Sequence, residues 1–75
     1  MTKRETLQLI LDKAARGWVI KKPPPNDPDD PENLCIFQNL FTYQEAAVEI
    51  PTALFDPPDL IEIEARVRSA IRSAR

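Results

Sequence analysis

The chain has no histidine and only one glycine among its 75 residues, and these absences limit the chemistry that it can carry. Histidine is the commonest general base in nucleophilic catalysis, and glycine-rich loops are the usual backbone cradle for phosphates. The two serines, Ser69 and Ser73, fall in a polar helical pattern that offers no obvious base. We therefore expect no enzymatic activity, no catalytic residues and no cofactor.

Cysteine and long apolar runs are also scarce. The single Cys35, between Leu34 and Ile36, cannot form an internal disulfide and fits a reducing compartment. No apolar run approaches the roughly 20 residues that span a bilayer, and residues 1–5 lead into an acid-containing amphipathic pattern rather than a signal sequence. The sequence thus predicts a cytoplasmic protein without a membrane partner, folded as one domain over residues 1–75.

Basic residues are missing from the long middle segment, residues 23–65. Its ten acids are Asp27, Asp29, Asp30, Glu32, Glu45, Glu49, Asp56, Asp59, Glu62 and Glu64. Each flanking end has a net charge of plus four, so the formal net charge of −2 conceals a strongly polar molecule. A dense surface of one sign usually meets the opposite charge, either in the same fold or on a partner.

The first third of the chain predicts a helix followed by a strand. Thr2 and Glu5 have the spacing of a capping box, and a helix over residues 3–16 would place its apolar side chains on one face. Gly17 stands where a left-handed residue commonly ends a helix. Residues 18–22 then read as a strand, with Trp18 and Ile20 on one face and Val19 on the other.

Five of the eight prolines fall within residues 23–33, so this stretch is expected to be a stiff, extended loop. Residues 34–38 form a second strand candidate, because four of these five residues are apolar. Pairing it with residues 18–22 would give a two-stranded antiparallel ribbon. The connecting loop would be unusually long for a hairpin.

A short helix is predicted over residues 43–50, from a second capping box at residues 42–45 and from apolar residues at Tyr43, Ala46, Ala47 and Ile50. Pro51 would end it. Residues 41–51 resemble the first helix of a small helix-turn-helix regulator of the excisionase type. Residues 52–58 contain no basic recognition helix, and without one the motif cannot read bases, so no family is assigned.

The strongest helix signal lies at the end of the sequence. Asp56 is the expected N-cap, Pro57 the first-turn residue, and Phe55 can staple to Leu60. The expected apolar stripe consists of Leu60, Ile63, Val67, Ala70, Ile71 and Ala74. Glu62 with Arg66 and Glu64 with Arg68 are favourable i,i+4 ion pairs. Together these elements predict a small α+β domain, and an all-α domain if the strands are not formed.

The leading functional hypothesis is a non-enzymatic accessory, adaptor or inhibitor protein that binds the basic surface of a larger protein through its acidic middle. The residues expected to make contact are Pro25, Asp27, Pro28, Asp29, Asp30 and Glu32. Prolines lower the entropy cost of presenting these carboxylates, which could also imitate nucleic-acid charge. A calcium site is not expected, because the stretch has no glycine for the required turn.

A nucleic-acid-binding protein is the alternative. Its candidate phosphate contacts are Arg66, Arg68, Arg72 and Arg75, with Lys21 and Lys22. The sequence pI near 5.0 weakens this interpretation, because phosphates attract basic surfaces. A structural subunit of a larger assembly is a further alternative, as is a homodimer formed through Leu60, Ile63 and Val67 or through exposed aromatic residues.

Overall fold

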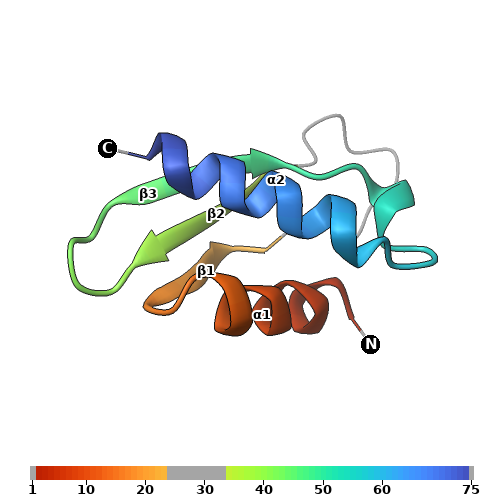
Figure 1. Ribbon diagram of the computed structural model, residues 1–75, viewed down its shortest axis with the longest axis horizontal. Coiled ribbons are helices and arrows are strands. Elements are labelled where there is room, and N and C mark those ends of the chain that lie inside the picture. The colour runs from red at the N-terminus through yellow and green to blue at the C-terminus, as the bar shows by residue number, and fades with distance from the viewer. Residues whose placement is uncertain (1, 24–33, 75) are drawn as a thin grey trace.

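A computed structural model describes residues 2–23 and 34–74 of the protein. The elements follow in the order α1 (Lys3–Ala14), β1 (Trp18–Lys22), β2 (Leu34–Asn39), β3 (Glu45–Glu49), the short 3-10 helix η1 (Thr52–Leu54) and α2 (Leu60–Ser73). The strands form one antiparallel sheet in the order β1-β2-β3, and both helices lie on the same face of it (Figure 1). The α+β class is confirmed, with three strands instead of two.

Helix α1 begins as its sequence predicts. The Thr2 hydroxyl accepts a hydrogen bond from the Glu5 amide at 3.1 Å, and the Glu5 carboxylate accepts one from the Thr2 amide at 3.1 Å. These bonds satisfy amides that a helix start would otherwise leave unpaired, and the bond from the Thr2 amide holds the pKa of the Glu5 carboxyl below its usual range. The helix ends at Ala14, two residues earlier than predicted, and Gly17 has the expected positive φ of 92°.

The predicted hairpin between β1 and β2 is confirmed. Trp18 pairs with Asn39 and Ile20 with Phe37, so both β1 side chains point toward the helices. The register shifts between Ile20 and Lys22, which marks a β-bulge near the end of β1. Most of the proline loop that was predicted to join the two strands, residues 24–33, lies outside the described residues.

The short helix predicted over residues 43–50 is wrong, because Glu45–Glu49 is the strand β3. Ala46, Val48 and Ile50 are buried at alternate positions, which is the period of a strand, whereas Ala47 is exposed. The predicted capping box is instead part of the turn between β2 and β3, where Thr42 Oγ1 accepts a hydrogen bond from the Gln44 amide. Pairing with β2 decides the structure, because it satisfies the backbone and buries one face.

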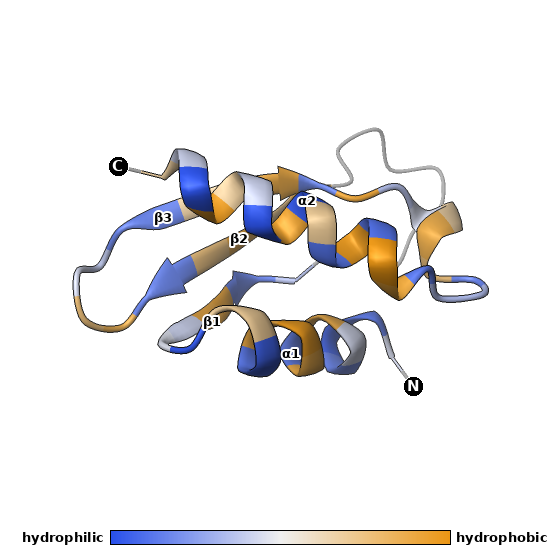
Figure 2. Ribbon diagram, in the orientation of Figure 1, coloured by the Kyte–Doolittle hydropathy of each residue, from blue (hydrophilic) through white to orange (hydrophobic). Residues whose placement is uncertain are grey.

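Helix α2 starts later than predicted. Its N-cap is Asp59, whose carboxylate accepts a hydrogen bond from the Glu62 amide at 3.1 Å, whereas Asp56 lies in the preceding loop, before a cis peptide bond to Pro57. Leu60 is 55% exposed and so does not belong to the buried stripe. Figure 2 shows hydrophobic and hydrophilic residues alternating along α2, as an amphipathic helix requires.

The core lies between the sheet and the two helices, which lie side by side (Figure 1). Its fully buried large side chains come from every layer: Leu7 and Leu11 of α1, Phe37 of β2, Ile50 after β3, and Ile63 and Val67 of α2. Because Ile63 and Val67 have no exposed surface, they hold the domain together and are not available for the homodimer contact predicted from the sequence.

Candidate functional site

Most of the residues predicted to bind a partner fall outside the described part of the chain. These are Pro25, Asp27, Pro28, Asp29, Asp30 and Glu32 of the acidic loop, and Arg75 of the arginine set. The described part nevertheless contains six of the ten acids of the basic-free middle segment. Their surroundings show how far that segment is neutralised within its own fold.

Three glutamates of the middle segment form ion pairs with the basic ends of the chain. Glu45 on β3 meets Lys21 on β1 at 2.7 Å, and on α2 Glu62 accepts a hydrogen bond from Arg66 at 3.1 Å. Glu64 lies 3.6 Å from Arg68 and 3.9 Å from Lys13 of α1. The acidic middle and the basic ends of the sequence therefore partly neutralise each other within the folded molecule. All of these pairs are substantially exposed, so each is worth only about 0–1 kcal/mol.

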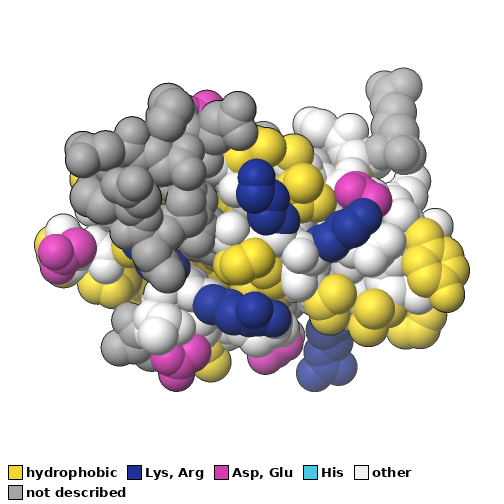
Figure 3. Space-filling view, turned by 180° about the vertical axis from the view of Figure 1, so that it is seen from behind, with side chains coloured by type: hydrophobic (Ala, Val, Ile, Leu, Met, Phe, Trp, Pro, Cys, Tyr) yellow, Lys and Arg dark blue, Asp and Glu magenta, His cyan; other side chains and the backbone are white. Residues whose placement is uncertain are grey.

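Three carboxylates of the middle segment remain exposed and take no part in the ion pairs of the described residues: Glu49, Asp56 and Asp59, the last of which caps α2. Glu49 ends β3, on the face of the sheet opposite the helices, and Asp56 lies in the loop before α2. Figure 3 views that open face of the sheet and shows basic side chains interspersed with hydrophobic ones. Glu45 and Glu49 both point to this open face from β3, the strand at one border of the sheet. Lys21, which pairs with Glu45, lies on the same face.

The arginine set on α2 is only partly available to a ligand. Arg66 and Arg68 are held by Glu62 and Glu64, and Arg66 also donates a hydrogen bond to the Glu49 carbonyl at 3.2 Å. Arg72 is exposed beside a small hollow between the ends of the two helices. The structure does not bring Arg66, Arg68 and Arg72 together as a continuous unpaired surface.

The turn between β2 and β3 presents a surface that the sequence did not predict. Leu40, Phe41 and Tyr43 are 54%, 82% and 73% exposed, and we call them the hairpin tip. In Figure 3, hydrophobic side chains gather at the end of the molecule where this turn lies. The helix predicted over residues 43–50 obscured this cluster, because it assigned Tyr43 to the packed face of that helix. The available signal was the turn-forming Asn39 before a run of large apolar residues.

Hydrogen bonds hold the turn that carries the hairpin tip. The Asn39 carboxamide oxygen accepts from the amides of Phe41 and Thr42 at 2.8 and 3.1 Å, and the Asn39 carbonyl accepts from the Tyr43 amide at 2.9 Å. Tyr43 has a φ of 61°, a left-handed conformation that an aromatic residue rarely adopts. The Leu40 amide also donates to the Gly17 carbonyl at 2.8 Å, so the tip is braced against the α1–β1 turn.

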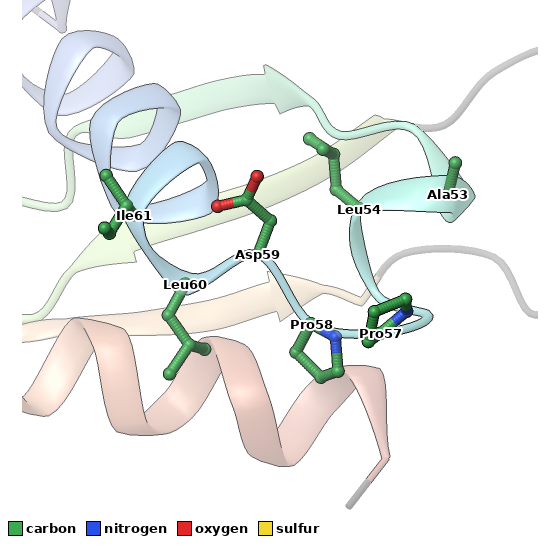
Figure 4. A pocket seen from close by; sticks show the side chains of 7 residues that line it. All are labelled: Ala53, Leu54, Pro57, Pro58, Asp59, Leu60 and Ile61. Carbon is green, nitrogen blue, oxygen red and sulfur yellow. The ribbon is translucent and has the colours of Figure 1, made fainter.

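A shallow, open hollow of about 620 Å³ lies at the start of α2. Figure 4 shows its lining from η1 to the first turn of α2, with Pro57 and Pro58 below Leu54 and with Leu60 pointing toward α1. Its only ionisable side chain is Asp59, which already caps the helix. The other lining residues, Ala53, Leu54, Pro57, Pro58, Leu60 and Ile61, have no side chain that could act with this carboxylate as a nucleophile–base pair.

Cys35 is the one conventional nucleophile with a perturbed pKa in the described residues, and its surroundings suppress its reactivity. The side chain is fully buried, its Sγ lies 3.5 Å from the Val48 carbonyl, and burial raises the pKa of the thiol to about 11. A thiol in this environment stays protonated near neutral pH and acts as a small core residue.

Within residues 2–23 and 34–74, no three His, Cys, Asp or Glu side chains cluster in a way that could hold a metal ion. In the same residues, neither helix has the length and apolar character needed to cross a lipid bilayer. Comparison with protein-family models, with curated proteins and with solved structures finds no significant match to this chain. The function must therefore be inferred from the chain's own surfaces.

Proposed function

We propose that this protein is a non-enzymatic interaction module that binds the basic surface of a larger protein through the carboxylates of its middle segment. The observation that carries the proposal is the incomplete internal neutralisation of that segment. The ion pairs of the described residues engage Glu45, Glu62 and Glu64, and leave Glu49, Asp56 and the helix-capping Asp59 exposed. The four acids of residues 27–32 add to this charge.

Carboxylates at the surface of such a module contribute mainly to the rate and specificity of association. Complementary charges accelerate encounter with a basic partner and disfavour acidic competitors, while exposed pairs add little affinity by themselves. A second, apolar contribution is needed for a stable complex. The hairpin tip offers it, because Phe41 and Tyr43 are exposed aromatic side chains on a braced turn, and buried aromatic anchors dominate most interfaces.

The arginine-based alternative has less support from the geometry. Phosphate binding requires basic side chains that can approach the backbone of a nucleic acid without nearby carboxylates. Arg66 and Arg68 are each paired with a glutamate one turn earlier on α2, and Glu64 also contacts Lys13. An acidic module that imitates nucleic-acid charge is compatible with these pairs, because its target would be a basic protein groove.

The proposal is tested by capturing partners of the tagged chain from lysate of the source cells, with and without nuclease, at low and high salt. We expect one protein to be retained after nuclease treatment, and to be retained less when Asp27, Asp29 and Asp30 are changed to Asn and Glu32 to Gln. A matched variant, Glu62→Gln with Glu64→Gln, should retain it normally, because Arg66, Arg68 and Lys13 already engage these carboxylates.

Two results would refute the proposal. One is retention that depends on nucleic acid and disappears with nuclease, since that would favour the arginine-based alternative. The other is a retained protein that binds the wild type and the acid-to-amide variant equally at low salt.

A further inference from the structure

Strand β3 forms one border of the sheet, so one side of its backbone has no neighbouring strand among the described residues. The register with β2 identifies which residues face that border. The Asn39 amide donates to the Gln44 carbonyl at 2.9 Å, which makes Asn39 and Gln44 a hydrogen-bonded position of the ladder. Such positions alternate along an antiparallel pair, so Ala46 and Val48 bond to β2, whereas Glu45, Ala47 and Glu49 turn their backbone groups outward.

Arg66 provides independent support for this assignment. Its Nη1 donates to the Glu49 carbonyl at 3.2 Å from outside the sheet, so that carbonyl must point away from β2. None of the hydrogen bonds found within residues 2–23 and 34–74 involves the outward amides and carbonyls of Glu45 or Ala47. An edge of this kind is a template for another extended chain.

The side chains of the same three residues determine which chain can be added. Glu45, Ala47 and Glu49 all point to the open face of the sheet, because Ala46 and Val48 are buried on the helix side. Two carboxylates therefore flank one small residue, with about 13 Å between the ends of the row. If a second copy of β3 paired with the first in the antiparallel sense, centred on Ala47, each Glu45 would face a Glu49. Like charges directly opposite each other are destabilising, so the pattern discourages self-pairing.

We propose that the free edge of β3 accepts an extended protein segment that carries Lys or Arg at two positions four residues apart. The segment would add as an antiparallel fourth strand, with its basic side chains opposite Glu45 and Glu49 and the residue between them over Ala47. This inference rests on the proposed function, because it specifies how the acidic middle meets a basic partner. The hairpin tip precedes β3 directly, so a partner on this edge would also reach Phe41 and Tyr43.

The existing contacts of Glu45 and Glu49 do not close the edge. Lys21 meets only one carboxylate oxygen of Glu45, in an exposed pair of the kind that contributes little. The Glu49 carbonyl that accepts from Arg66 has a second lone pair, so an incoming backbone amide can share it.

A variant of the protein itself supplies a defined probe. Glu45→Lys with Glu49→Lys presents the same strand with two lysines four residues apart. Mixed with wild type, it would place each lysine opposite a glutamate, whereas either protein alone would place like charges together. We expect the mixed dimer to be at least about tenfold tighter than either homodimer. It should weaken with salt and should slow hydrogen exchange at the backbone amides of positions 45 and 47 in both chains. Sedimentation velocity and NMR of the mixture would measure these effects.

Two further variants keep the test decisive. Glu49→Lys alone retains the Glu45–Lys21 pair and is self-complementary in the antiparallel register, so it should dimerise without wild type. Asp12→Lys with Asp56→Lys changes the charge by the same amount at exposed positions away from β3, and should not bind wild type.

The inference is overturned if folded Glu49→Lys and the lysine-bearing mixture both remain monomeric at about millimolar concentration, where even weak strand pairing would be detected. Association without amide protection at positions 45 and 47, or equal association of the control variant, would also overturn it. These results would leave the proposed function intact if a captured partner still required the acids of residues 27–32. Conversely, if the strands pair but a captured partner binds equally well without the acids of residues 27–32, the strand inference stands and the proposed function is wrong.

Discussion

Cys35 links burial to the pH dependence of stability. In the folded protein the pKa of its thiol is about 11, whereas the pKa of an unperturbed cysteine thiol is 9.0. Above pH 9 the unfolded chain loses this proton and the folded chain retains it, so the free energy of unfolding should fall by up to about 2–3 kcal/mol as the pH rises to 11. Below pH 9 this contribution is fully present.

Urea unfolding at several pH values between about 8 and 11 would measure the effect of Cys35. Cys35→Ala is the control, because it removes the thiol and leaves every other titrating group in place. The wild type should lose stability more steeply than the variant over this range. Parallel curves would show that the thiol is not protected from ionisation.

Gly17 is constrained in two ways, by its backbone conformation and by a closely packed neighbouring side chain. It has a φ of 92°, and a Cβ added there would lie 2.9 Å from Cε2 of Phe41. Gly17→Ala should therefore lower the free energy of unfolding by about 1–3 kcal/mol. In a Phe41→Ala background the cost should become smaller without disappearing, because the backbone strain remains. Chemical denaturation of the four proteins would show this, and an unchanged stability of Gly17→Ala would contradict it.

At the scale of elements, β3 can be tested with two adjacent alanines. Ala46 is buried on the helix side of the sheet, and Ala47 is exposed on the other side. Ala46→Lys should destabilise the protein by about 3 kcal/mol or more, since it buries a charge without a partner. Ala47→Lys should change stability by less than about 0.5 kcal/mol. Urea unfolding would compare the two variants. The helix predicted from sequence placed both alanines on one buried face, so equal losses would contradict the strand.

The start of α2 permits a similar comparison between two aspartates. Asp59→Ala removes the side chain that caps the Glu62 amide and should cost about 1 kcal/mol. Asp56→Ala removes an exposed carboxylate that is not the N-cap and should cost less than about 0.5 kcal/mol. Thermal unfolding of both variants would distinguish them, and a larger loss for Asp56→Ala would move the helix start back to the residue predicted from sequence.

The elements that the sequence predicted well are those that local interactions decide. Thr2 and Glu5 cap α1 through bonds within one turn, and Gly17 adopts its turn conformation through its own backbone freedom. The ion pairs of Glu62 and Glu64 with arginines also depend on neighbours four residues away. Each of these interactions can be inferred from residues that are close together in the sequence.

The elements that the sequence missed depend on distant partners. Residues 45–49 carry both a helical spacing and an alternating one, and pairing with β2 selects the strand. The hairpin tip was missed for the same reason, because Phe41 and Tyr43 become exposed only when residues 39–44 form a turn. Short apolar segments do not distinguish helix from strand by periodicity alone.

In the whole molecule, the basic ends of the chain neutralise part of the charge of its acidic middle segment. The basic ends supply Lys13, Lys21, Arg66 and Arg68 to three glutamates of the middle segment. The exposed carboxylates of Glu49 and Asp56 and the hairpin tip take no part in these pairs. These are the features of the described residues that we expect a basic protein partner to contact.

The most direct test is the affinity of the protein captured from lysate, once purified, for the wild type and for the variant with Asp27, Asp29 and Asp30 changed to Asn and Glu32 to Gln. We predict that the variant binds at least about tenfold more weakly at low salt, and that the difference narrows as salt screens the charges. Equal affinities for the two proteins across the salt series would contradict the central claim that the acidic middle makes the contact.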